Sequence, residues 1–81
     1  MARLPQVSGK NLIKLLRSLG YSVVRTRGSH VRLRKATEAG EHNITVPNHR
    51  VVAKGTLNDI LSAVSVQNGI PRERLINQLR G

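Results

Sequence analysis

The chain has no cysteine, tryptophan or phenylalanine, and Tyr21 is its single tyrosine. Without cysteine, thiol catalysis, disulfide bonds and cysteine-ligated metal sites are excluded. Sheets that read single-stranded RNA by stacking bases need several exposed aromatic rings, which this sequence cannot supply. We therefore expect Tyr21 to pack at the edge of the core, and any nucleic-acid contact to be made to the backbone.

Acidic residues are also scarce, because four Asp and Glu accompany fourteen Lys and Arg, a formal charge of +10. So much charge of one sign on a small body repels itself, and a polyanion such as nucleic acid would relieve that repulsion. The few carboxylates do not cluster as a two-metal nuclease requires. The histidines show no metal-ligand spacing. We expect no metal and no cofactor.

Long apolar runs are missing as well. No segment approaches the roughly 20 apolar residues that span a bilayer, and the N-terminus lacks the apolar stretch of a signal peptide. These absences favour a cytoplasmic protein without a membrane partner. The 81 residues suffice for one domain over residues 1–81, with a core over residues 8–64 and a helical extension over residues 65–81.

Apolar spacing predicts three helices. Ser8 can cap a first helix that Gly20 ends, with a buried face formed by Leu12, Leu15, Leu16 and Leu19. Thr56 is expected to cap a second helix with Asp59 in its first turn, and this helix fades over residues 65–69. Pro71 suits the first position of a short third helix that carries Leu75, Ile76 and Leu79.

Between the first two helices the pattern favours strands over residues 21–27, 30–34 and 43–46. Gly28 and Ser29 form a tight turn, residues 35–41 a polar loop, and Pro47 ends the third strand. The fold class is therefore α+β in the order α-β-β-β-α. A three-stranded antiparallel sheet has two helices on one face, with a short C-terminal helix added.

Apolar and polar side chains alternate strictly along the second predicted strand, so they lie on opposite faces of the sheet. Val31 and Leu33 fall on the buried face, whereas His30, Arg32 and Arg34 fall on the open one. An imidazole between guanidinium groups suits RNA cleavage without a metal, because it can take the proton of a 2′-hydroxyl while the cations stabilise the charged phosphorane. A surface histidine that only binds phosphate fits the same spacing.

Other basic residues suggest further phosphate contacts. Lys10, Lys14 and Arg17 form a stripe on the first helix that also fits a solvated face. Lys54 stands near the start of the second helix, where backbone N–H groups attract anions, although ordinary capping explains the same residues. The expected RNA-contacting residues are Lys10, Lys14, Arg27, Gly28, Ser29, Arg32, Arg34, His49 and Lys54.

Several stretches together resemble the HicA (YcfA-like) family of bacterial toxins. They are Ser8–Leu16 with Leu19–Tyr21, Val24–Leu33, Ile44–Pro47 with His49, and Lys54–Leu61. The resemblance implies a double-stranded-RNA-binding-domain-like fold and a metal-independent ribonuclease that cleaves mRNA and arrests translation. It makes His30 of the Gly-Ser-His motif the catalytic residue. It also implies neutralisation by a HicB-type antitoxin, often within a higher toxin–antitoxin oligomer.

Residues 65–81 are longer than the tail typical of that family and receive no family role. Two other functions fit the same pattern: a non-catalytic double-stranded-RNA-binding module and a basic protein-interaction domain. The imidazole of His30 beside Arg32 and Arg34 favours the ribonuclease, since a module that only binds RNA does not need it.

Overall fold

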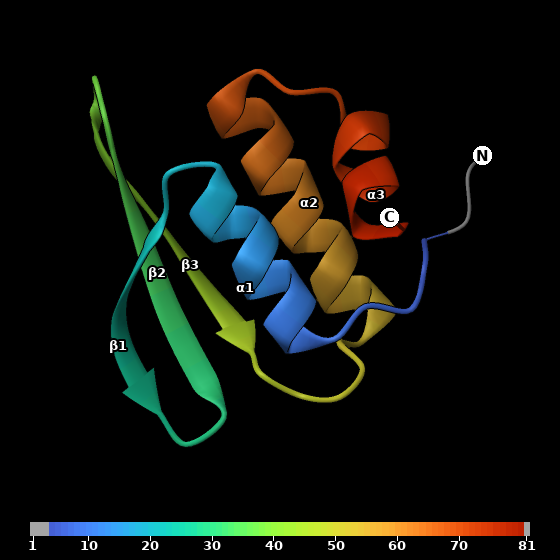
Figure 1. Ribbon diagram of the computed structural model, residues 1–81. Coiled ribbons are helices and arrows are strands. Elements are labelled where there is room, and N and C mark those ends of the chain that lie inside the picture. The colour runs from blue at the N-terminus through green and yellow to red at the C-terminus, as the bar shows by residue number, and fades with distance from the viewer. Residues whose placement is uncertain (1–3, 81) are drawn as a thin grey trace.

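The computed structural model describes residues 4–80, which form a sheet layer covered on one face by helices (Figure 1). The elements are α1 (Gly9–Ser18), β1 (Ser22–Arg27), β2 (His30–Thr37), β3 (Gly40–Pro47), α2 (Lys54–Asn68) and α3 (Arg72–Arg80). The strands pair antiparallel in the order β1-β2-β3, and the helices lie on one side of the sheet. The predicted α+β fold with an added C-terminal helix is confirmed.

One apolar core joins the layers. The alternating residues of β2 and β3 supply Val31, Leu33, Ile44 and Val46, which are buried together with the apolar stripes of α1 and α2. The predicted N-cap of α1 is confirmed, because the Ser8 hydroxyl accepts the Asn11 N–H at 3.1 Å. This core fixes which face of the sheet is left to solvent.

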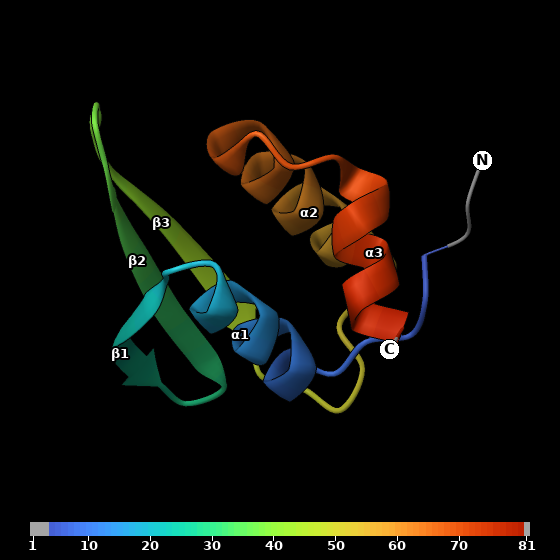
Figure 2. The same cartoon turned by 45° about the horizontal axis from the view of Figure 1, so that its top comes forward.

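The helix α3 lies over α1 and α2, on their side away from the sheet (Figure 2). Its Leu75 and Ile76 are buried in the common core. The guanidinium of Arg72 fastens it to α2, donating to the Ser62 hydroxyl at 2.6 Å and to the side-chain oxygen of Asn58 at 2.8 Å. The C-terminal helix is therefore an integral part of the fold.

The predicted start of α2 is wrong by three residues. The helix begins at Lys54, and its N-cap is Ala53, which makes no side-chain hydrogen bond. Thr56 thus lies inside the first turn, and Asp59 lies beyond it. A threonine at the start of an apolar stripe is a favourable cap, but here the Leu57 N–H donates to the Ala53 carbonyl at 2.9 Å, so the helix already includes the residues before Thr56.

The helix α2 ends within the predicted range, because it continues to Asn68 and its C-cap is Gly69, whose φ is 63°. Pro71 immediately precedes α3, and its carbonyl accepts the N–H groups of Arg74 and Leu75. The third helix therefore begins at Arg72, one residue later than predicted.

The polar loop predicted over residues 35–41 is instead the end of a hairpin. Ladder pairs continue to Thr37 and Gly40, which leaves residues 38–39 as a two-residue turn. Polar side chains are accommodated because an open hollow, lined by residues 35–39 with Gln67 and Asn68, separates this part of the hairpin from the end of α2. The backbone pairing of the hairpin needs no buried apolar face.

A polar network fills the inner side of that hairpin. The buried Tyr21 hydroxyl lies 2.6 Å from Nδ1 of His42 and accepts a hydrogen bond from the side-chain Nδ2 of Asn68 at 3.1 Å. Nζ of Lys35 donates to the side-chain Oδ1 of Asn68 at 2.5 Å. Burial raises the pKa of Tyr21, and the hydrogen bond from Asn68 offsets part of that rise. The expectation that Tyr21 packs at the core edge is confirmed.

At the N-terminus of α1, Gly9 lies directly against the loop that follows β3. A Cβ at this position would be 2.5 Å from the Cα of Asn48 and 2.7 Å from the carbonyl oxygen of Pro47. The Gly9 N–H also donates to the His49 carbonyl at 2.9 Å. These contacts leave no room for a side chain.

We expect Gly9→Ala to lower the free energy of unfolding by about 1–3 kcal/mol, because backbone atoms must shift to admit the methyl group. Gly55→Ala is the matched control, since nothing lies within 4 Å of its Cβ position and alanine suits a helix better. Urea unfolding followed by circular dichroism measures both. Equal stability of the two variants would contradict the close approach.

Candidate functional site

The outer face of the sheet, which no helix covers, carries a shallow hollow of about 120 Å³. It is lined by Arg25, Arg27, His30, Arg32 and Thr45. The side chains of His30 and Arg32 are exposed there, as the alternation of β2 predicts. One histidine, three guanidinium groups and a hydroxyl therefore surround a space open to solvent.

Strand pairing brings these groups together. Arg27 is the cross-strand partner of His30, and Arg25 is that of Arg32. Such partners have Cβ atoms about 4.5–5.5 Å apart. Like charges directly opposite each other destabilise a sheet, and no carboxylate is among the residues that line the hollow. A bound anion would relieve this repulsion.

Arg25 is a residue of the hollow that the sequence analysis missed. The register on β1 moves by two residues, from Val23 to Arg25, while β2 moves by one, from Leu33 to Arg32. This β-bulge leaves Val24 as the extra residue and changes the face of the residues that follow. Arg25 and Arg27 thereby face outward. The doubled valine, which interrupts alternation, is the signal in the sequence.

The turn before His30 is tied to the loop after β3. The Asn48 N–H donates to the Ser29 carbonyl at 2.6 Å, and Nε2 of His49 lies 3.2 Å from the Ser29 hydroxyl oxygen. Gly28 has a φ of 57°, and nothing lies within 4 Å of its Cβ position. The predicted residues Gly28, Ser29 and His49 thus lie together beside the hollow, at the end of the sheet where β2 begins.

Arg34 lies farther along β2 and has partners of its own. Its Nε is 3.2 Å from a carboxylate oxygen of Glu41 and 3.1 Å from the side-chain oxygen of Asn43. Both side chains of the ion pair are nearly half exposed, so the pair contributes about 0–1 kcal/mol. Arg34 shares the outer face but does not line the hollow.

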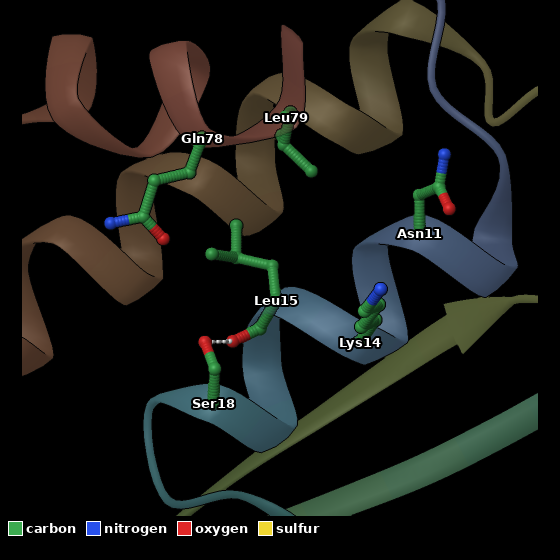
Figure 3. Close-up of a pocket in the computed structure, with 6 residues that line it drawn as sticks. All are labelled: Asn11, Lys14, Leu15, Ser18, Gln78 and Leu79. Carbon is green, nitrogen blue, oxygen red and sulfur yellow. Dashed lines mark hydrogen bonds between the residues drawn. The ribbon is translucent and has the colours of Figure 1, made fainter. Parts of the chain in front are cut away.

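The three predicted lysines are not brought to the hollow. Lys10 and Lys14 belong to α1 and Lys54 begins α2, both on the other side of the sheet (Figure 1). Lys14 lines a larger hollow of about 400 Å³ between α1 and α3, with Leu15 and Leu79 at its base (Figure 3). That hollow contains one cation and no imidazole, so it is less suited to phosphodiester chemistry.

Within residues 4–80, no group of three or more His, Asp and Glu side chains is placed to hold a metal ion. In the same part of the chain, every helix is too short or too polar to cross a bilayer. The hollow itself offers one imidazole, three guanidinium groups and the hydroxyl of Thr45.

Comparison with known proteins places this site within a family. The family model for the HicA toxin of bacterial toxin–antitoxin systems matches residues 9–66. No curated protein and no solved structure matches the chain significantly. The matched segment contains α1, the whole sheet with its hollow and most of α2, whereas α3 follows it.

Proposed function

The chain belongs to the HicA toxin family of bacterial toxin–antitoxin systems, and we propose that it acts as a metal-independent endoribonuclease that cleaves mRNA and thereby inhibits translation. The observation that supports this activity best is the exposed imidazole of His30 in a hollow lined by three arginines. Cleavage of RNA requires a base for the 2′-hydroxyl and cations for the charged phosphorane, and the hollow offers both.

In the proposed reaction, the RNA backbone lies across the outer face with one phosphate in the hollow. The imidazole of His30 takes the proton of the adjacent 2′-hydroxyl, and the 2′-oxygen attacks phosphorus. The guanidinium groups of Arg25, Arg27 and Arg32 stabilise the pentacoordinate phosphorane. The bond to the 5′-oxygen then breaks, and this oxygen takes up a proton. The products are a 2′,3′-cyclic phosphate and a free 5′-hydroxyl.

The remaining predicted contacts are assigned to the rest of the RNA strand. Gly28 and Ser29 lie next to His30 and are exposed to solvent, so the sugar–phosphate backbone of the RNA can approach them closely. Arg34 extends the outer face toward the hairpin. Lys10, Lys14 and Lys54 would be reached only by RNA that passes around the edge of the sheet. Protonated His30 or water supplies the proton for the 5′-oxygen, because Lys54 begins α2 on the helix side of the sheet (Figure 1) and His49 does not line the hollow.

We expect His30→Ala to reduce the rate of RNA cleavage in EDTA by about 10²–10⁴-fold, since general-base catalysis contributes that much. Gel analysis of a short labelled RNA measures the rate, and mass spectrometry identifies the cyclic phosphate. His42→Gln is the matched histidine control, because His42 contacts Tyr21 within the hairpin network and does not line the hollow.

An RNA with a 2′-deoxyribose at the cleaved position should bind but resist cleavage by the wild-type protein. If His30→Ala cleaves as fast as wild type, His30 is not the base. If wild type binds RNA but never cleaves it, the chain is instead a non-catalytic RNA-binding module.

Arginines of the hollow should set the salt dependence of RNA binding. In a His30→Ala background, where RNA stays intact, Arg25→Ala or Arg32→Ala should reduce the slope of log affinity against log salt by about 0.7–0.9 for each lost phosphate contact. Arg74→Ala, an exposed arginine on α3, should leave the slope unchanged. Equal slopes for Arg25→Ala and Arg74→Ala would remove Arg25 from the binding face.

We assign a HicB-type antitoxin as the neutralising partner and the outer face of the sheet as the surface it covers. Its binding there would exclude mRNA in the cytoplasm, and several copies could join in a higher toxin–antitoxin oligomer. Expression alone should arrest growth, and co-expression of the protein encoded beside it should relieve the arrest. Arrest that persists despite a purified stable complex would contradict neutralisation by that protein.

A further inference from the structure

The turn that precedes His30 depends on contacts from outside its own hairpin. Every residue of β1 is exposed, and so are Gly28 and Ser29. β1 and the turn therefore contribute no buried side chain, and the buried residues of the hairpin begin with Val31 on β2. From outside the hairpin, Asn48 and His49 hydrogen-bond to the carbonyl and to the hydroxyl of Ser29.

The loop that carries these two residues is itself fixed. Pro47 is the cross-strand partner of His30, so the loop leaves the sheet beside the site. The Gly9 N–H holds the His49 carbonyl at 2.9 Å, and the backbone of residues 47–48 packs against Gly9 too closely to admit a Cβ. A chain of contacts thus runs from the buried start of α1 through this loop to the turn.

We propose that His49 is a positioning residue, whose imidazole holds Ser29 and so sets the backbone from which His30 enters the hollow. The proposal rests on the proposed ribonuclease activity for its functional part. His30 is the first residue of β2, so its orientation depends on the turn immediately before it. A displacement of about 1 Å in a reacting group can reduce a rate by about 10²-fold.

The chemistry of the hydrogen bond between His49 and Ser29 suggests which variants to compare. Neutral imidazole can donate to the Ser29 hydroxyl or accept from it at Nε2, and a glutamine amide placed similarly can do the same. Alanine can do neither. His49→Gln should therefore preserve the hydrogen bond, whereas His49→Ala and Ser29→Ala should both remove it.

The kinetic test measures kcat and KM for a short RNA in EDTA across pH, with folding checked by circular dichroism. His49→Ala should lower kcat by about 10–100-fold with little change in KM, while His49→Gln stays within about threefold of wild type. Ser29→Ala combined with His49→Ala should be no slower than His49→Ala alone, because both remove one contact. The shape of the pH–rate profile should not change.

Different results would overturn the proposal. If His49 donates the proton to the 5′-oxygen, His49→Gln and His49→Ala lose activity equally, and one limb of the pH profile disappears. If His49 only binds phosphate, KM rises with kcat unchanged. If the effects of Ser29→Ala and His49→Ala multiply, the two residues do not act through one contact.

A second measurement does not depend on activity. Amide hydrogen exchange by NMR should be faster at Asn48, whose N–H donates to Ser29, in His49→Ala than in wild type or His49→Gln. Equal exchange in the three proteins would show that His49 does not hold the turn. If wild type fails to cleave RNA, the proposed function fails. The rate of amide exchange at Asn48 still decides whether His49 holds the turn before His30.

Discussion

Burial of one face of a three-stranded sheet is the constraint on which the rest of this molecule depends. Because side chains alternate along β2, placing Val31 and Leu33 in the core directs His30 and Arg32 to the opposite surface. The hydrophobic effect that stabilises the fold therefore also orients the side chains of the candidate site. A shift of one residue in this register would bury the imidazole and expose the leucine.

Cationic groups on the open surface are concentrated rather than dispersed. Arg25 and Arg32 are directly opposite each other, and the carboxylate of Glu41 pairs with Arg34 outside the hollow. Repulsion among these cations costs the free protein some stability, and a bound polyanion would relieve it. The proposed RNA binding and its salt dependence would therefore have the same origin.

Much of this architecture follows from local patterns. The cap at Ser8 and the outward orientation of His30 were predicted from residue type and spacing, because each depends on only a few neighbouring residues. Arg25 was not predicted, because its direction depends on a bulge in strand pairing. The cap at Thr56 was predicted wrongly, because the Leu57 N–H already donates to the Ala53 carbonyl and the helix therefore includes the residues before Thr56. The contact of His49 with Ser29 joins segments 20 residues apart, which no local pattern specifies.

The attachment of α3 separates the thermal stability of the fold from the geometry of the outer face, two properties that are usually coupled in so small a protein. This helix adds Leu75 and Ile76 to the core from the side opposite the hollow, and Arg72 secures it to α2. Changes at well-separated sites generally act additively. Thermal robustness can therefore evolve, or be engineered, at the C-terminal end of the chain while the outer face of the sheet keeps its geometry.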